Sequence, residues 1–134
     1  MATLKLEIVT PEAKIYSEDV DMVTLPGVEG EMGIFPMHVP LMTQLAAGEI
    51  VARKGGQDQF LAVGDGFVEI TGERVAVMTD MAIRAENIDE LKAEEARKRA
   101  EARLAEKLDD TEVASVNAAL AHSLAQLKVK RRQK

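Results

Sequence analysis

The sequence predicts an all-β domain, built as a sandwich or a barrel, followed by an antiparallel hairpin of two α-helices. All four prolines and all nine glycines lie before residue 86, where they separate short runs rich in β-branched residues. Residues 86–134 contain neither residue type and are rich in the strong helix formers Ala, Glu, Lys, Arg and Leu. We therefore expect a β-domain over residues 1–85 and a helical hairpin over residues 86–134.

The β part begins with residues 4–9, where apolar and polar side chains alternate as in a half-buried strand. Thr10-Pro11-Glu12 ends this run. Further strands are expected over residues 15–17, 20–25, 41–45, 49–53, 60–62, 67–70, 75–79 and 81–84. Turns are expected at Pro26-Gly27, at residues 54–57, at Gly64-Asp65-Gly66 and at residues 72–74.

The helical part contains two N-terminal capping patterns. Asn87 with Glu90 matches an N-cap and its partner, and apolar residues then recur at helical spacing as far as Leu108. Asp109 with Glu112 repeats the pattern and predicts a second helix after a turn of two or three residues. The apolar stripe of that second helix consists of Val113, Val116, Leu120, Leu124 and Leu127.

Both apolar stripes of the hairpin are narrow, and the first consists mostly of alanine. Two helices of this length bury little surface between them and are marginally stable without further packing. The hairpin therefore needs a partner surface, either the β-domain or another protein. We hypothesise that it is a movable element.

The composition excludes several kinds of chemistry. There are no cysteines, so thiolate metal sites and cysteine nucleophiles are excluded. The two histidines are far apart in sequence and neither has a second ligand at metal-binding spacing, so no metal site is expected. No serine has a glycine-flanked nucleophile context, and Gly64-Asp65-Gly66 lacks the third glycine of a dinucleotide loop. A stand-alone enzyme is therefore not expected.

The charge distribution points away from nucleic acid. The formal net charge is −6, whereas phosphate contacts need a basic surface. The last seven residues nevertheless carry five cations, among them Lys128, Lys130, Arg131 and Arg132. Such a tail is typical of contact with an acidic partner, and the alternative is a solvated terminus. No apolar run is long enough to span a bilayer.

One long segment carries a resemblance to a known family. Residues 25–45, which read LPGVEGEMGIFPMHVPLMTQL, resemble the characteristic segment of the epsilon subunit of rotary F-type ATP synthases. The glycines, prolines and His38 match in order and spacing, and residues 6–12 and 66–70 resemble further family segments, although Asp65 stands where a glycine is common. His38 lies between two prolines that stiffen the loop, where its ring either caps backbone groups or contacts a partner.

The resemblance implies a ten-stranded β-sandwich followed by two helices. It also implies a non-catalytic place at the foot of the central stalk, bound to the gamma subunit and the ring of c subunits, where the subunit couples proton-driven rotation to ATP synthesis. In family members the hairpin folds onto the sandwich or extends along gamma. The extended form restrains ATP hydrolysis, with basic residues near an acidic stretch of the catalytic beta subunits, a role that Lys128, Lys130, Arg131 and Arg132 would fill here.

Some bacterial members of the family bind ATP in the folded hairpin. The positions that match their motif are Ile88, Asp89, Lys92, Ala93 and, further along the first helix, Arg99. Lys92 replaces an arginine, and a lysine lacks the bidentate fork of a guanidinium. His122 and Gln126 replace two further arginines. Weak or absent ATP binding is therefore expected, with no other cofactor.

Two readings compete with a rotor-stalk subunit. One is a free-standing nucleotide sensor that binds ATP in the hairpin, and the other is an independent enzyme. The family resemblance favours the stalk subunit over both. The absence of a transit peptide favours a bacterial protein, held peripherally on the cytoplasmic face of the plasma (inner) membrane through the complex.

Overall fold

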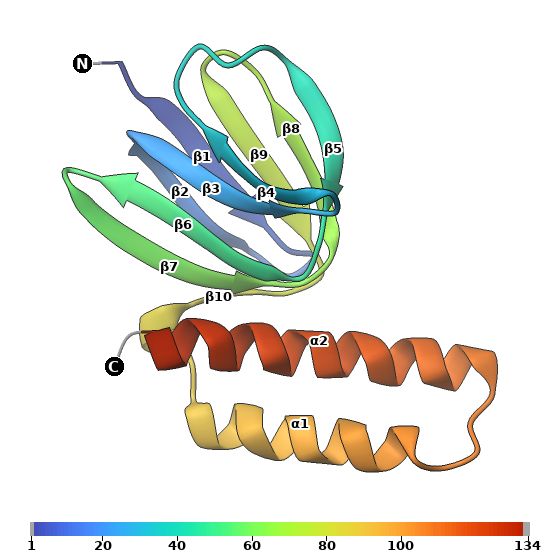
Figure 1. Cartoon of the computed structure of the whole chain (residues 1–134). Helices are drawn as coiled ribbons and strands as arrows, with labels where there is room; N and C mark the ends of the chain where they lie inside the picture. The colour runs from blue at the N-terminus through green and yellow to red at the C-terminus, as the bar shows by residue number, and fades with distance from the viewer. Residues whose placement is uncertain (1, 133–134) are drawn as a thin grey trace.

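The computed structural model describes residues 2–132, and Figure 1 shows a β-domain stacked on two antiparallel helices. The β-domain has ten strands, which agrees with the predicted fold class. They are β1 (Leu4–Val9), β2 (Lys14–Val20), β3 (Met22–Gly27), β4 (Gly30–Ile34), β5 (Leu41–Leu45), β6 (Gly48–Lys54), β7 (Gln57–Val63), β8 (Gly66–Ile70), β9 (Arg74–Thr79) and β10 (Ala82–Arg84).

The ten strands form one sheet that folds over on itself (Figure 1). The strand order is β10-β7-β6-β3-β5-β8-β9-β1-β2, with β4 also paired to β3. β3 and β5 meet at a single residue pair, Gly27 with Leu45, so the sheet turns a corner there. The two halves enclose a core of aliphatic side chains and Tyr16, including Leu6, Ile8, Val23, Leu25, Ile34, Ile50, Leu61, Val68, Ile70, Val75 and Val77.

Two details of the predicted strands are wrong. The single strand expected over residues 20–25 is divided at Asp21, whose N–H donates to the carbonyl of Arg53 at 2.7 Å. Pro26 and Gly27 extend β3 instead of forming a turn, and the chain turns at residues 28–29 into β4. Pro26 is tolerated because the pairing of β3 with β6 ends at Thr24, so its missing N–H costs no bond of that ladder.

The link between the two parts is the short 3₁₀ helix η1 (Ala85–Asn87). Arg84, just before it, is fastened to the β-domain. Its guanidinium lies 4.9 Å from the centre of the Tyr16 ring and 3.7 Å from Glu18, and it donates to the carbonyl of Ile15 at 3.4 Å. The backbone is therefore anchored to the sandwich immediately before the helical part begins.

The hairpin consists of α1 (Glu90–Leu104) and α2 (Asp110–Arg132). Asp109 precedes α2, and its side chain accepts from the N–H of Glu112 at 2.7 Å, as predicted. The predicted cap of α1 is wrong. Asp89 is the N-cap, accepting from the N–H of Lys92 at 3.1 Å, whereas Asn87 lies in η1. The turn is also longer than expected because α1 ends at Leu104.

The partner of the hairpin in this structure is the β-domain. α2 packs on β6 and β7, and α1 packs against α2 (Figure 1). The shared cluster consists of Ala62, Ala85, Ile88, Ala125 and Val129, bordered by Phe60, Met81 and Ile83. The predicted stripes are only partly buried, because Leu91 is 78% exposed and Leu124 is 48% exposed. The contact is small and rich in alanine, so it stabilises docking modestly.

Candidate functional site

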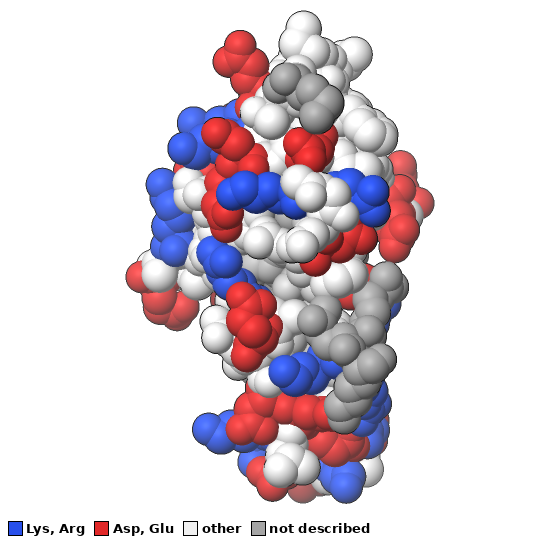
Figure 2. Space-filling view, turned by 90° about the vertical axis from the view of Figure 1, so that its left-hand side faces the viewer, with Lys and Arg blue, Asp and Glu red and all other residues white. Residues whose placement is uncertain are grey.

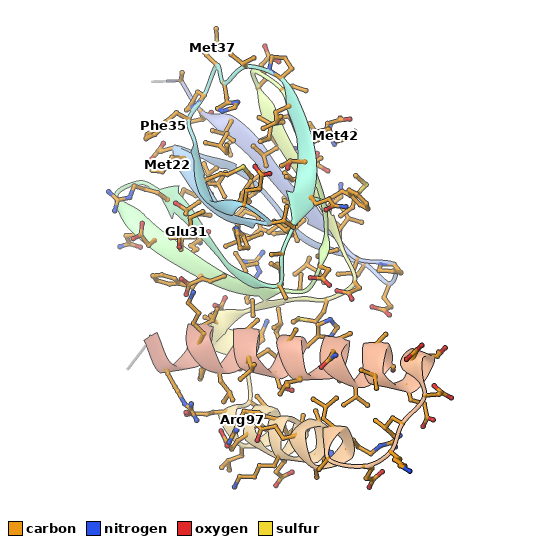
Figure 3. All side chains as sticks on the ribbon, turned by 45° about the vertical axis from the view of Figure 1, so that its right-hand side comes forward. Met22, Glu31, Phe35, Met37, Met42 and Arg97 are labelled. Carbon is orange, nitrogen blue, oxygen red and sulfur yellow. The ribbon has the colours of Figure 1, made fainter. Side chains whose placement is uncertain are left out.

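Apolar side chains gather at the end of the β-domain that lies away from the helices. We call this surface the apolar end, and it consists of Phe35, Met37, Val39, Leu41 and Met42. Their exposed fractions range from 43% for Leu41 to 79% for Met37. Figure 3 shows Phe35, Met37 and Met42 pointing outward there. Several large apolar side chains exposed at one end of a domain indicate a site of protein interaction.

The loop between β4 and β5 holds these side chains outside the core. Pro36 and Pro40 remove two backbone donors, so the loop cannot continue the sheet. Met37 has φ +70°, a conformation unusual for a residue with a side chain, and its N–H donates to the carbonyl of Gly72 at 2.7 Å. This bond ties the loop to the β8–β9 turn, so the apolar end is presented in a fixed shape.

His38 lies within this loop and is half-buried. Its Nδ1 is 2.6 Å from the carbonyl oxygen of Val39. A carbonyl can only accept, so Nδ1 carries the hydrogen and Nε2 is left for other partners. The structure thus gives His38 the backbone-capping role considered from the sequence, at a position inside the apolar end.

Two shallow grooves flank the loop. One, of about 540 Å³, is lined by Ala2, Asp21, Phe35, Pro36 and Met37. The other, of about 460 Å³, is lined by Pro40, Leu41, Met42, Glu69, Ile70 and Thr71. Each combines apolar walls with a carboxylate, which suits a partner with protruding loops that carry both apolar and polar groups.

The basic C-terminal residues are partly bound within the chain. Arg131 reaches across to α1, where its guanidinium lies 3.2 Å from a carboxylate oxygen of Glu90 and 2.8 Å from one of Glu94. Lys130 donates to the carbonyl of Ala85 at 3.4 Å. Lys128 is exposed, and the side chain of Arg132 lies outside the described part of the chain. The tail therefore does not project freely at Arg131.

The start of α1 carries a network of opposite charges. Arg97 binds Glu94 and also Glu101 at 2.7 Å. The hydrogen bond from Arg97 and, less strongly, the contact with Arg131 hold the pKa of Glu94 below its usual value, against the effect of burial. Figure 3 labels Arg97 at this position, and Figure 2 shows positive and negative side chains intermixed over this end of the hairpin.

The five residues that match the ATP motif do not converge on one open cavity. Ile88 and Ala93 are buried, and Asp89 is the helix cap. Lys92 and Arg99 are exposed on α1, and Arg99 lies on the rim of a groove of about 360 Å³ between the helices.

The two α2 positions of the ATP motif face the β-domain. Nε2 of His122 is 3.1 Å from the Asp80 carboxylate, and Gln126 lies against the sulfur of Met81 at 3.9 Å. At the start of α1, the Glu90 and Glu94 carboxylates add negative charge. These residues fit a nucleotide triphosphate poorly.

Within residues 2–132, no cluster of three or more His, Cys, Asp or Glu side chains could hold a metal ion. Neither of the described α-helices is long and apolar enough to cross a membrane.

Some contacts were not predicted from the sequence. The apolar end was not predicted as a surface. The apolar residues at alternate positions between Pro36 and Pro40 could have indicated it, because a loop constrained by two prolines cannot place them in the core. The His122–Asp80 and Arg131–Glu90 contacts join residues about 40 positions apart, and no local pattern reveals them.

Comparison with known proteins assigns both parts of the chain. Residues 3–85 match the family ATP synthase, Delta/Epsilon chain, beta-sandwich domain, and residues 86–131 match the family ATP synthase, Delta/Epsilon chain, long alpha-helix domain. This chain belongs to the ATP synthase delta/epsilon family. The resemblance seen in residues 25–45 is thereby confirmed, as is the order of a β-sandwich followed by helices.

Individual delta/epsilon family members resemble the chain over nearly its full length. An ATP synthase epsilon chain from Dehalococcoides mccartyi is 49% identical over 130 residues, covering 96% of this chain and 93% of the relative. One from Laribacter hongkongensis is 40% identical with the same coverage.

Two solved structures have the same fold. A chain in the mitochondrial ATP synthase of Euglena gracilis superposes with a TM-score of 0.79 at 26% identity, covering 96% of this chain and 81% of that one. A chain in the Tetrahymena thermophila mitochondrial ATP synthase has a TM-score of 0.62 at 11% identity, covering 97% and 95%, and shows the shared fold alone.

Proposed function

We propose that this protein is a non-catalytic subunit of the central stalk of an F-type ATP synthase, where it joins the ring of c subunits to the gamma subunit. Family membership supports this, as does the likeness to a chain in an assembly described as OSCP, F1 and c-ring. The observation that carries the proposal is the apolar end. It is exposed, remote from the helices and tied to the β8–β9 turn by the Met37–Gly72 bond, as suits a surface that grips a rotating ring.

The coupling role follows from this geometry. A subunit that transmits torque must hold its partners through a surface that does not deform, and the β-domain presents its apolar end on a folded-over sheet around a buried aliphatic core. The protein has no catalytic task in this scheme. It sits on the cytoplasmic face of a bacterial inner membrane and is attached there only through the complex.

The hairpin supplies regulation. We assign residues 1–85 to the coupling unit and residues 86–134 to a movable regulatory unit. One support is the small contact through which α2 docks on the β-domain. Another is that Arg131 is paired with the carboxylates of Glu90 and Glu94, so that it is not available to an acidic surface of the beta subunits. Released and extended, the hairpin restrains ATP hydrolysis. Equal amide-exchange protection in the hairpin and the sandwich core would contradict its mobility.

Recovery of the tagged chain from detergent-solubilised membranes tests the coupling role. The wild-type chain is expected to bring down gamma and c subunits. Met37→Asp together with Met42→Asp, which places two charges in the apolar end, is expected to lose the c subunits. Met78→Asp is the matched control, because Met78 is an exposed methionine outside the apolar end. Wild-type recovery without gamma and c, or equal recovery by all three chains, contradicts the proposal.

ATP sensing is the second candidate, and the arrangement of the motif residues does not favour it. Calorimetric titration of the isolated chain with ATP is expected to show weak binding or none. Lys92→Arg is expected to add little, because His122 and Gln126 remain turned toward the β-domain. Submillimolar affinity of the wild-type chain would reverse this preference.

A further inference from the structure

The middle of α2 carries one side chain whose charge changes near neutral pH. Between Glu112 and Lys128 the sequence contains no Asp, Glu, Lys or Arg, and the only histidine there is His122. Histidine is the side chain that titrates between about pH 5 and pH 8 in its ordinary state. α2 lies on β6 and β7. Any side-chain charge that the middle of α2 brings to this contact therefore comes from His122.

His122 meets a carboxylate of the β-domain in a closely fitted contact. Its Nε2 lies 3.1 Å from Oδ2 of Asp80, in the link between β9 and β10. Gly64 lies directly beneath the pair. A methyl group at Gly64 would collide with Oδ1 of Asp80 and come within 2.7 Å of Nε2 of His122. The chain thus leaves room for this contact only because residue 64 has no side chain.

The elements packed around α2 carry further charged groups. Glu49 on β6 is buried and pairs in register with Ala62, which packs against α2, so the two side chains share the face that α2 covers. Asp65 lies in the β7–β8 turn beside Asp80. η1 adds Glu86, and on α1 the cation Arg97 is bound to two glutamates of its own helix.

We propose that His122 and Asp80 form a proton-operated latch for the helical hairpin. Protonated His122 donates a charge-assisted hydrogen bond to Asp80, and this bond exists only while α2 lies on the β-domain. The charge-assisted bond needs the protonated ring, so the latch is strongest at acidic pH and weakens as the pH rises through the ordinary range of histidine.

Through the latch, docking of the hairpin responds to the pH around the protein. Where the released hairpin restrains hydrolysis, which rests on the proposed function, a more alkaline cytoplasm strengthens that restraint. Docking and release are properties of the chain alone, so the latch can be tested without the rest of the synthase.

The test uses energy transfer within the full-length chain. Because the chain contains no cysteine, Gln57→Cys on the β-domain and Asn117→Cys on α2 allow placement of two dyes. The ratio of docked to released hairpin is expected to fall about fivefold between about pH 5.5 and about pH 8.5, the size expected for one partly exposed charge pair. His122→Gln and Asp80→Asn, each similar in size to the original residue, are expected to abolish this pH dependence.

Two controls identify the group that titrates. His38→Gln removes the only other histidine and is expected to leave the pH dependence intact, as is Glu49→Gln, which neutralises the buried carboxylate beneath α2. A pH-independent wild-type ratio, persistence of the response in His122→Gln or Asp80→Asn, or its loss in either control overturns the latch. Any of these results leaves the membrane recovery experiment unaffected, so failure of the latch is distinguishable from failure of the stalk assignment.

Discussion

At the scale of single residues, Glu7 shows how a charge is accommodated in the sheet. It is 6% exposed on β1, with Lys14 at 3.3 Å on one side and Arg74 at 2.5 Å on the other. The hydrogen bond with Lys14 holds the pKa of Glu7 below its usual value. The charge of Arg74 adds to this, and both outweigh the opposing effect of burial.

This lowered pKa gives a prediction of acid sensitivity. The ion triad stabilises the fold above the ordinary pKa of a glutamate and loses its contribution as the pH falls through the lowered value. The melting temperature of the wild-type chain should exceed that of Glu7→Gln near neutral pH, and the difference should shrink below about pH 4. Glu69→Gln, an exposed change on β8, is the control with no such difference. A gap between wild type and Glu7→Gln that is constant with pH would contradict the account.

Asp89 and Asn87 provide a second test at this scale. Asp89→Ala should lower the helix stability of α1 by about 1 kcal/mol, because the N–H of Lys92 loses its acceptor. Asp89→Ser should restore most of it. Asn87→Ala should have little effect, since Asn87 lies in η1 and no cap bond involves it. Amide exchange in the first turn of α1 measures the three changes, and a larger effect at Asn87 would mean that the cap is misassigned.

The carboxylates that hold Arg131 test the regulatory role. Glu90→Gln with Glu94→Gln leaves the arginine in place and removes its partners in the docked form. ATP hydrolysis by the assembled synthase should fall by about twofold at low salt, because the cation is no longer held by α1 and is free to meet an acidic partner surface. Glu95→Gln, an exposed neighbour on α1, is the control. Unchanged ATP hydrolysis in the double variant would show that Arg131 takes no part in regulation.

At the scale of elements, the docking of α2 depends on a few small side chains. Val129 is fully buried against the β-domain cluster, whereas Leu124 is half exposed on the same helix. Val129→Ala should weaken docking by about 1 to 3 kcal/mol, which lowers the docked-to-released ratio about fivefold or more. Leu124→Ala, the larger truncation, should change it far less. The dye-labelled chain used for the latch measures both, and a larger loss for Leu124 would mean that α2 docks through its other face.

The elements also show what a sequence alone can reveal. Strands with clear alternation, such as β1 and β9, and helix starts with a capping pair, such as Asp109 with Glu112, were predicted closely. β4 was missed from the pattern because Gly30–Ile34 contains two glycines and no clear alternation. Local rules also placed the α1 cap at Asn87, since both Asn87 and Asp89 suit the role and only the path of η1 decides between them.

At the scale of the whole molecule, the fold class and family were accessible from the sequence because they depend on long, local patterns. The two features on which the functional proposals rest were not. The apolar end depends on the bond between Met37 and Gly72, and the latch on Gly64 leaving room for His122 and Asp80. Each joins segments far apart in the chain, so each becomes visible only when the β-domain and the hairpin are assembled.

We propose above that the apolar end grips the rotor ring. A photoreactive amino acid placed at Met42 in the full-length chain, assembled into the synthase in native membranes, tests this most directly. Illumination should produce a covalent product with the c subunit, and the same amino acid at Asp58 on β7 should not. Products with c from Asp58, or none from Met42 in a fully assembled complex, would contradict the account.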